Sequence, residues 1–430
     1  MLADQISTPY KQYMYAYPHK TAYGKLNDID IKPYFRFLNS STNHLYVHLP
    51  FCQAKCGFCN LFSVAGGSSS YIDSYLDTIE RQLAHLTRHE EVYKARYASL
   101  VLGGGTPLLL SINQLVRLLD MVEKYLPVSL TETYSVVETS PKQSETEKLK
   151  RIKERGVNRL SLGVQSFLED ELKTLGRSHS LGDILQALER IHKVGFDEVN
   201  LDLIYGIPGQ TEESFNHSIN RVLDFRPHEI FAYPLYVKEG TPLFSCINNG
   251  EDTRLALYRL VRDKLVAAGY RQTSMRRFTL DDKPDSGCGF DNTIALGCGG
   301  RSYLGNLHFC EPFTVNQQQC KKSIDSYLQK TDFMRATNGF ILNPDEQKRR
   351  YAIKHLLYHT GIGKVEYSRS FNSNVTNDFP IIAQLVERGY AYNENETVKL
   401  NDQGLALSDY IGTLFISPDV QQKMDSYILP

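Results

Sequence analysis

Three cysteines, Cys52, Cys56 and Cys59, are the residues of this chain whose spacing most clearly indicates chemistry. They lie so close together that one short loop can present three thiolates. Three thiolates are one ligand short of a closed tetrahedral metal site. They suit a [4Fe–4S] cluster with one iron left open to a small molecule, because a cluster held by protein alone takes four thiolates. The alternatives are a zinc site that borrows His48, or three unrelated buried thiols.

The bulk composition is that of an ordinary globular protein. The 430 residues can bury a large core in about two or three domains. A formal net charge of −1 gives no general attraction to nucleic acid or to an anionic membrane. The sequence has no stretch apolar enough for a membrane span, and its first residues lack the basic start of a secretory signal. We therefore expect a cytoplasmic protein with reduced thiols. Simple packing is the expected role of Cys246, Cys288, Cys298, Cys310 and Cys320.

Residues 44 to 237 alternate short apolar runs with helical stretches. This alternation implies right-handed crossovers and a parallel sheet. Six such units are fewer than the eight of a closed TIM barrel, so we expect an α/β fold with a partial (β/α)6 barrel and its site at the carboxyl ends of the strands. The expected strands are 44–49, 98–102, 133–138, 159–164, 198–205 and 230–236, and the expected helices are 71–88, 111–125, 143–155, 181–194 and 212–225.

The pattern divides the chain into four parts. We expect an N-terminal arm over 1–43, the barrel over 44–240, a barrel extension and connecting region over 241–342, and a C-terminal module over 343–430. The extension has a helical stretch over 252–268 and an irregular, Gly-rich stretch over 288–306.

The C-terminal module has the element order of a winged helix. Asn343 and Pro344 are a good N-cap and first-turn pair for a helix to residue 358. Two shorter helices, a hairpin over 390–393 and 397–400, and a closing helix follow. Residues 345–430 hold nine Lys or Arg against eleven Asp or Glu, so this α+β module lacks the surplus of cations that a DNA-binding surface needs. We expect a substrate lid or docking module and no nucleic acid.

Polar or glycine residues end four successive strands of the expected barrel. Gly103, Gly104 and Gly105 would let a ligand approach the backbone closely. Glu138 ends the next strand, Gln165 offers an amide suited to ribose hydroxyls, and Asp202 is a carboxylate within an apolar strand that needs a partner. Any one of these residues alone favours a structural role, but four in succession favour a shared pocket.

Together these motifs resemble a known family. The cysteine spacing, with Phe58 just before the last cysteine, resembles the radical S-adenosylmethionine (SAM) superfamily, and the whole set resembles its oxygen-independent coproporphyrinogen III oxidase-like group. The resemblance runs from about residue 46 to residue 236 and resumes in the C-terminal module. It implies that Cys52, Cys56 and Cys59 hold a [4Fe–4S] cluster whose open iron chelates SAM. One electron, from a flavodoxin or ferredoxin, would split SAM to a 5′-deoxyadenosyl radical that abstracts hydrogen from the substrate.

The resemblance also implies which residues contact SAM. Tyr46, Gly104 and Glu138 would contact the cluster-bound SAM, with the Glu138 carboxylate near its amino group. Phe58 would pack beside the adenine. The residues matching a second SAM site are Gly105, Thr106, Gln165, Arg177 and Asp202.

Two features depart from the oxidases of this group. Leu61 stands where those oxidases carry a fourth cysteine, and the arm from Tyr10 to Tyr23 holds five tyrosines in fourteen residues. The arm is either aromatic packing against the barrel or part of the catalytic site. Together with the stretch from Arg301 to Tyr303, the arm resembles a bacterial subfamily. The relatives of that subfamily include heme chaperones, heme-opening enzymes and carbon methyltransferases.

Three functions follow as hypotheses. The leading one is a SAM-radical enzyme acting on a tetrapyrrole-like or related carboxylated aromatic substrate, covered by the N-terminal arm and the C-terminal module. Its candidate substrate contacts are the run from Met275 to Phe278, which contains Arg276 and Arg277, together with Arg301 and His308. The second is a carbon methyltransferase that uses two SAM molecules. The third is a heme chaperone without turnover.

Overall fold

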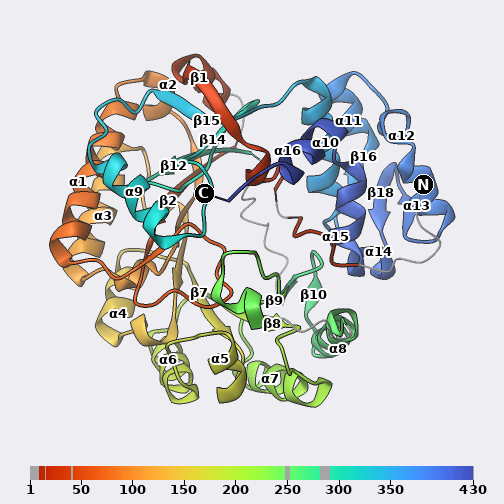
Figure 1. Cartoon of the computed structure of the whole chain (residues 1–430), viewed down its shortest axis with the longest axis horizontal. Helices are drawn as coiled ribbons and strands as arrows, with labels where there is room; N and C mark the ends of the chain where they lie inside the picture. Colours follow the sequence, from red (N-terminus) through yellow and green to blue (C-terminus); the bar gives the residue numbers. More distant parts are fainter. Residues whose placement is uncertain (1–8, 15, 40–41, 247–251, 281–290, 430) are drawn as a thin grey trace.

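The computed structural model describes residues 9–14, 16–39, 42–246, 252–280 and 291–429. Six parallel strands form the centre of its large sheet (Figure 1), and they match the six strands predicted from the sequence. The predicted α/β fold with a central parallel sheet is therefore confirmed. In sheet order these strands are β2 (Asn43–Leu49), β5 (Tyr97–Gly104), β6 (Tyr134–Thr139), β7 (Arg159–Gln165), β8 (Glu198–Tyr205) and β9 (Glu229–Pro234).

Helices follow these strands along the chain and lie around the outside of the sheet (Figure 1). Several begin at a capping residue: Ser111, Ser180 and Thr211 each form a capping box, in which the side chain binds backbone N–H groups that the first turn leaves free. The predicted helix over 143–155 starts later, because residues from Pro141 first form a short 3-10 turn. The helices are α1 (Ser69–Leu86), α2 (Glu90–Tyr93), α3 (Ile112–Tyr125), α4 (Thr146–Glu154), α5 (Glu169–Thr174), α6 (Leu181–Val194), α7 (Glu212–Phe225) and α8 (Arg254–Ala267).

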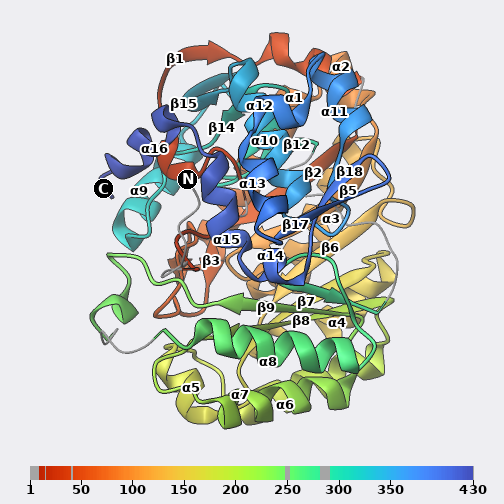
Figure 2. The ribbon, with the colours of Figure 1, turned by 90° about the vertical axis from the view of Figure 1, so that its right-hand side faces the viewer.

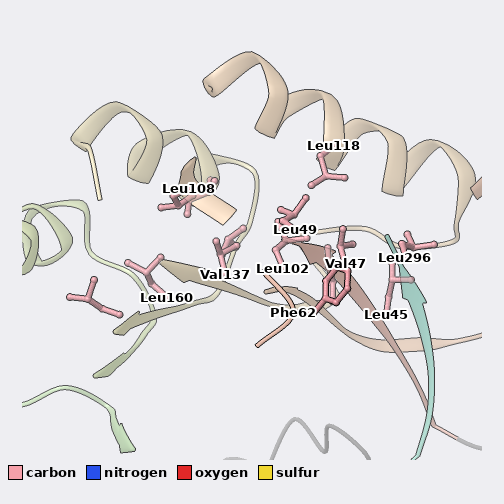
Figure 3. Packing of buried hydrophobic residues seen from close by; sticks show 14 of the residues in the cluster. Leu45, Val47, Leu49, Phe62, Leu102, Leu108, Leu118, Val137, Leu160 and Leu296 are labelled. Carbon is pink, nitrogen blue, oxygen red and sulfur yellow. The ribbon is translucent and has the colours of Figure 1, made fainter. Parts of the chain in front are cut away.

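The main core lies between the sheet and these helices. On β2, Leu45, Val47 and Leu49 are fully buried, and Figure 3 shows them in the same cluster as Leu102 of β5 and Leu118 of α3. Alternate residues of a strand point to opposite faces. Tyr46 and His48 of the same strand therefore face the other side, where the site lies.

The sheet continues beyond the predicted barrel on both sides. A seventh parallel strand, β12 (Asn292–Leu296), pairs with β2, and antiparallel strands follow it. The expectation of an irregular stretch over 288–306 is wrong for 292–296 and 302–304, which form strands, whereas 297–301 lie in no helix or strand. Residues 288–290 lie outside the described residues. All five residues of β12 are buried, so it shows no alternation, and the glycines after it resemble a loop. The further strands are β13 (Ser302–Leu304), β14 (Leu307–Phe309), β15 (Arg335–Ile341) and β1 (Gly24–Asp30) on one side, and β11 (Arg277–Thr279) and β10 (Arg271–Gln272) on the other.

The C-terminal residues follow the predicted element order. Asn343 caps α10 (Pro344–Leu356), and three short strands form a separate sheet in the order β16-β18-β17. These residues pack around their own hydrophobic cluster, which Met14, Tyr17 and Tyr23 of the arm join. In Figure 2 the helices of this part face the viewer, and β9 lies below them in the picture. The remaining elements are α9 (Gln317–Leu328), β16 (Ile362–Gly363), α11 (Lys364–Phe371), α12 (Val375–Asp378), α13 (Ile381–Glu387), β17 (Ala391–Glu394), β18 (Thr397–Leu400), α14 (Asp402–Ala406), α15 (Ser408–Ile411) and α16 (Pro418–Asp425).

Helix length and composition also bear on membranes. Over the described ranges, no helix combines the length and the apolar character needed to cross a bilayer.

Candidate functional site

The cysteine loop leaves the carboxyl end of β2 and is held in place by backbone contacts. β3 (Phe51–Cys52) pairs with β4 (Val64–Ala65) at the two ends of the loop. The Lys55 ammonium donates to the carbonyl oxygens of Leu61, Ser63 and Val315 at 3.3, 3.1 and 2.8 Å. These bonds close the loop on itself and fix the positions of the three cysteines.

Each of the three thiols has a polar neighbour, two of them from outside the loop and one, Ser63, from within it. Arg177 Nη1 donates to Cys56 Sγ at 3.1 Å, and Thr106 Oγ1 donates to Cys52 Sγ at 3.8 Å. The Ser63 hydroxyl lies 3.9 Å from Cys59 Sγ. All three thiols are half-buried. Burial raises the pKa of the Cys52 thiol to about 11, so a bound cation is needed to hold it as a thiolate at neutral pH.

The donor set fits a cluster better than a single zinc ion. Within the described ranges, no three His, Cys, Asp or Glu side chains are close enough to bind one metal ion. His48 is engaged elsewhere: its Nε2 lies 2.9 Å from the Phe62 carbonyl oxygen and its Nδ1 lies 3.2 Å from the Tyr46 hydroxyl. A [4Fe–4S] cluster binds each thiolate through a different iron, so its ligands stand farther apart than those of one ion. The zinc alternative therefore loses its proposed fourth ligand.

The structure brings eleven of the twelve predicted site residues to one pocket of about 180 Å³. Tyr46 lines the larger cavity beside it, and Glu138 and Leu61 line both. The eleven residues are Cys52, Cys56, Phe58, Cys59, Gly104, Gly105, Thr106, Glu138, Gln165, Arg177 and Asp202.

Strand register explains why these side chains meet. Glu138 of β6 lies opposite Ser161 of β7, and Gly163 of β7 lies opposite Asp202 of β8. The Gly104 N–H donates to Glu138 Oε2 at 3.1 Å. Gly104 has φ +109°, and a Cβ there would lie 2.6 Å from the His48 ring, so only glycine fits this contact.

Gln165 and Arg177 occupy constrained positions on the same wall. Gln165 has φ +73°, a left-handed conformation that is uncommon outside glycine, beside an irregularity in the pairing of β7 with β8. Arg177 Nη2 donates to the Gly163 carbonyl oxygen at 2.5 Å while Nη1 binds Cys56. Arg177 thus links the cysteine loop to β7.

Two buried carboxyl groups of this pocket have raised pKa values. Desolvation raises the pKa of Glu138 to about 7; the Gly104 N–H opposes the shift and Asp202 adds to it. Desolvation likewise raises the pKa of Asp202 to about 6, against the hydrogen bond that Asn200 donates at 2.8 Å. A cation bound between these groups would favour their ionised forms.

We predict that SAM affinity depends on the charge of Glu138. Below about pH 7 the carboxyl is mostly neutral and cannot pair with the SAM ammonium, so the Kd for SAM should fall by at most about tenfold per unit as the pH rises from about 6 to about 7. Asp202, Arg159 and Tyr233 also act on this group. Equilibrium binding across the pH range measures the effect.

Glu138→Gln should flatten this pH dependence and weaken SAM binding at pH 8. The matched control is Glu147→Gln, in which an exposed carboxylate of α4 is neutralised. A Glu138→Gln profile with the native slope would contradict the assignment.

The larger cavity, of about 490 Å³, lies beside the cysteine pocket. The N-terminal arm, the ends of the barrel strands, the strand extension and the C-terminal helices all line it. Of its described lining residues, six are Lys or Arg and two, Glu138 and Glu311, are acidic. Many of the others are Tyr or Phe. The cations are Lys20, Lys238, Arg276, Arg301, Arg350 and Lys354.

Not all of the predicted substrate contacts reach this cavity. Met275, Arg276 and Arg301 line it, whereas Arg277 is buried in an ion pair with Glu229. Arg276 is itself paired with the buried carboxylate of Asp409. The expectation that Arg276 and Arg277 both lie on the substrate side is therefore wrong for Arg277, which does not line the cavity and shares Glu229 with Arg159. Arg276 does line the cavity, but it already has Asp409 as a counter-charge.

Sequence reasoning missed several cations of the cavity. Lys238, Arg350 and Lys354 belong to different elements, and nothing in their local sequence relates them to the cysteine loop. Only Lys354 could have been related to another of these cations from the sequence. It follows Arg350 by four residues, and this spacing places both side chains on one side of a helix.

Comparison with known proteins agrees with the geometry of the site. Residues 46–222 match the Radical SAM superfamily. The chain is 29% identical over 382 residues to the heme chaperone HemW of Bacillus subtilis, covering 86% of this chain and 98% of the chaperone. It is 26% identical over 403 residues to the oxygen-independent coproporphyrinogen III oxidase of Pseudomonas aeruginosa, covering 86% of this chain and 85% of the oxidase.

A solved structure shares the fold. The coproporphyrinogen III oxidase HemN of Escherichia coli superimposes with a TM-score of 0.79 over 94% of this chain and 97% of that one, at 22% identity. The chain therefore contains a radical SAM domain, and its relatives include HemW heme chaperones and oxygen-independent coproporphyrinogen III oxidases. The predicted family resemblance is confirmed. A radical SAM domain implies a [4Fe–4S] cluster and SAM.

Proposed function

We propose that this protein is a radical SAM enzyme that acts on a tetrapyrrole-like substrate with carboxylate groups. When bound, the cluster and SAM would supply one-electron cleavage of SAM to a 5′-deoxyadenosyl radical. The observation that carries the proposal is the aromatic, cation-lined cavity of about 490 Å³ next to the cysteine pocket. Its cations would attract carboxylates, and its rings would pack against a flat aromatic ligand.

Within this proposal each part of the chain has a distinct task. Cys52, Cys56 and Cys59 would hold the cluster, and Tyr46, Gly104 and Glu138 would contact SAM. The pocket of about 180 Å³ is small for a ligand of this size, so we infer that SAM extends past Glu138 into the larger cavity. That arrangement would bring SAM and the substrate into contact. The arm and the C-terminal helices would exclude water from the radical.

Product analysis of anaerobic, reconstituted protein tests the proposal. The mixture contains dithionite to reduce the cluster, SAM, coproporphyrinogen III, and an added one-electron acceptor that takes the electron the substrate radical gives up when it loses carbon dioxide. We expect 5′-deoxyadenosine together with carbon dioxide released from the substrate. S-adenosylhomocysteine in addition would instead indicate the two-SAM methyltransferase, with the second SAM near Gly105, Thr106, Gln165, Arg177 and Asp202. Cleavage of SAM that leaves coproporphyrinogen III unchanged would contradict decarboxylation.

Heme chaperone activity is the second candidate, and the likeness to HemW over most of both chains favours it. Tight, stoichiometric heme binding in the same cavity without SAM turnover would support this candidate over the enzyme.

A radical SAM reaction needs an outside electron. We propose a flavodoxin or ferredoxin as its source, and the cytoplasm, where thiols stay reduced, as the compartment.

A further inference from the structure

Two buried polar atoms of the cysteine pocket lack a hydrogen-bond partner among the residues that the structure describes. They are Nε2 of His179 and Nε of Arg177. Both residues line the pocket of about 180 Å³, and His179 is 5% exposed. Buried polar groups are almost always hydrogen-bonded, so an orphaned pair in a pocket points to a bound group that satisfies it. His179 was not among the residues predicted for the site, although it follows Arg177 by two positions.

The chemical state of the His179 ring follows from its surroundings. A hydrogen bond to the Val164 backbone raises the pKa of the ring, so a ring N–H donates to the Val164 carbonyl oxygen. Because Nε2 has no partner in the described chain, the donor is Nδ1. Burial and the charge of Arg177 outweigh that bond and lower the pKa of His179 to about 3. The ring is therefore neutral at physiological pH, and Nε2 is an acceptor without a hydrogen.

Arg177 has the opposite requirement. Its Nη1 donates to Cys56 Sγ at 3.1 Å, and its Nη2 donates to the Gly163 carbonyl oxygen at 2.5 Å. A guanidinium cannot accept a hydrogen bond, so its Nε hydrogen can only be donated. The pocket thus holds an acceptor that lacks a hydrogen next to a hydrogen that lacks an acceptor. One ligand group can satisfy both only if it donates and accepts at the same time.

Few parts of SAM or of a carboxylated substrate meet this condition. A carboxylate only accepts, so it cannot bind Nε2 of His179. The SAM ammonium only donates, and Arg177 would repel both it and the sulfonium. A hydroxyl both donates and accepts. The adenine of SAM has a donor and an acceptor on one edge, but its flat ring suits the opposite wall, where Phe58 packs against the apolar cluster of Leu175 and Ile204.

We propose that His179 and Arg177 bind the ribose of SAM, with one ribose hydroxyl donating to His179 Nε2 and accepting from Arg177 Nε. Asp202 lines the same pocket and accepts from Asn200 through Oδ1, so its other oxygen can accept from the neighbouring hydroxyl of the diol. The inference rests on the proposed function, because it assigns part of SAM to residues of the pocket. The ribose belongs either to the cluster-bound SAM or to a second SAM, and binding stoichiometry separates these sources.

SAM binding to the anaerobic, cluster-loaded protein tests the assignment. The probes are SAM, 2′-deoxy-SAM and 3′-deoxy-SAM, measured by isothermal titration calorimetry without reductant. We expect native protein to bind SAM about tenfold or more tightly than at least one deoxy analogue, because the missing hydroxyl leaves two buried groups unsatisfied.

Two variants of His179 separate hydrogen bonding from packing. His179→Asn keeps an N–H near the position of Nδ1, and with it the bond to Val164, but lacks the acceptor. It should bind SAM about tenfold more weakly than native protein while binding the discriminated deoxy analogue equally well. His179→Gln places an amide oxygen near the position of Nε2 and should recover most of the affinity for SAM. The control is His192→Asn, which changes an exposed histidine in the last turn of α6.

The outcomes separate the ribose assignment from the proposed function. If native protein binds SAM and both deoxy analogues equally, the assignment is overturned while the proposed function stands. The same holds if His179→Asn weakens all three ligands by one factor, since that result indicates a structural role. A loss confined to a second equivalent of SAM supports the assignment and identifies the ribose as that of the second SAM. If cluster-loaded protein binds no SAM, both are overturned. Iron content and circular dichroism establish that each variant is folded.

Discussion

Replacing Cys56 with serine should leave a folded protein that has lost nearly all of its iron, its visible absorbance and its SAM cleavage. The reason is that the predicted cluster has three protein ligands and no fourth to compensate for a lost one. Arg177, which donates to Cys56 Sγ, would then face a neutral hydroxyl. Iron and sulfide analysis of anaerobically purified protein, with 5′-deoxyadenosine as the product measured, checks this result.

The matched control is Cys320→Ala. Cys320 is fully buried in α9, where its thiol donates to the Thr314 carbonyl oxygen at 3.7 Å and also lies beside the backbone of Ser63. It is thus a buried thiol next to the loop but outside the predicted ligand set. We expect this variant to keep its iron. A Cys56→Ser protein with native iron, or a native protein that contains zinc instead, would rule out the cluster.

Replacing Asp409 with asparagine should lower the free energy of unfolding by about 3–5 kcal/mol, because it leaves a buried arginine without its counter-charge. The Asp409 side chain is 0% exposed and pairs with Arg276. It also accepts a hydrogen bond from the Tyr236 hydroxyl at 2.6 Å and one from the Met14 N–H at 3.0 Å. One carboxylate thus joins the arm, the barrel and the C-terminal helices, so its loss weakens three contacts. Thermal and urea unfolding followed by circular dichroism measure the change.

Asp402→Asn is the control for that result. Asp402 also pairs with an arginine of the barrel part, Arg262, but its side chain is 71% exposed. An exposed pair contributes about 0–1 kcal/mol, so this variant should unfold almost as the native protein does. Equal effects of the two substitutions would contradict the role given to Asp409.

The barrel could be predicted because its signals are local. Strands such as β8 are apolar runs bounded by turn residues, and the sequence predicts its bounds, Glu198–Tyr205, correctly. The gathering of Glu138, Gln165 and Asp202 also followed from a general rule, since carboxyl ends of parallel strands meet at one edge.

The remainder of the site depends on contacts between distant segments. β12 joins β2 across roughly 250 residues of chain, and its five buried residues have no periodic pattern. The pairing of Arg276 with Asp409 is equally invisible in the sequence, because either residue alone is an ordinary surface charge. Consequently the sequence indicated only part of the lining of the cavity beside the cysteine pocket, namely Met275, Arg276 and Arg301.

The attachment of the arm to the last part of the chain has a consequence for biosynthesis. Met14 is bound by Asp409, and the Tyr17 hydroxyl contacts Glu346 and the Ser417 N–H. These bonds cannot form until about residue 417 has been translated, whereas the partners of the cysteine loop named above all precede residue 316. On the ribosome, the thiols are therefore positioned while the larger cavity is still open on the side of the C-terminal helices. This leaves a period in which iron and sulfide can be delivered before those helices cover the loop.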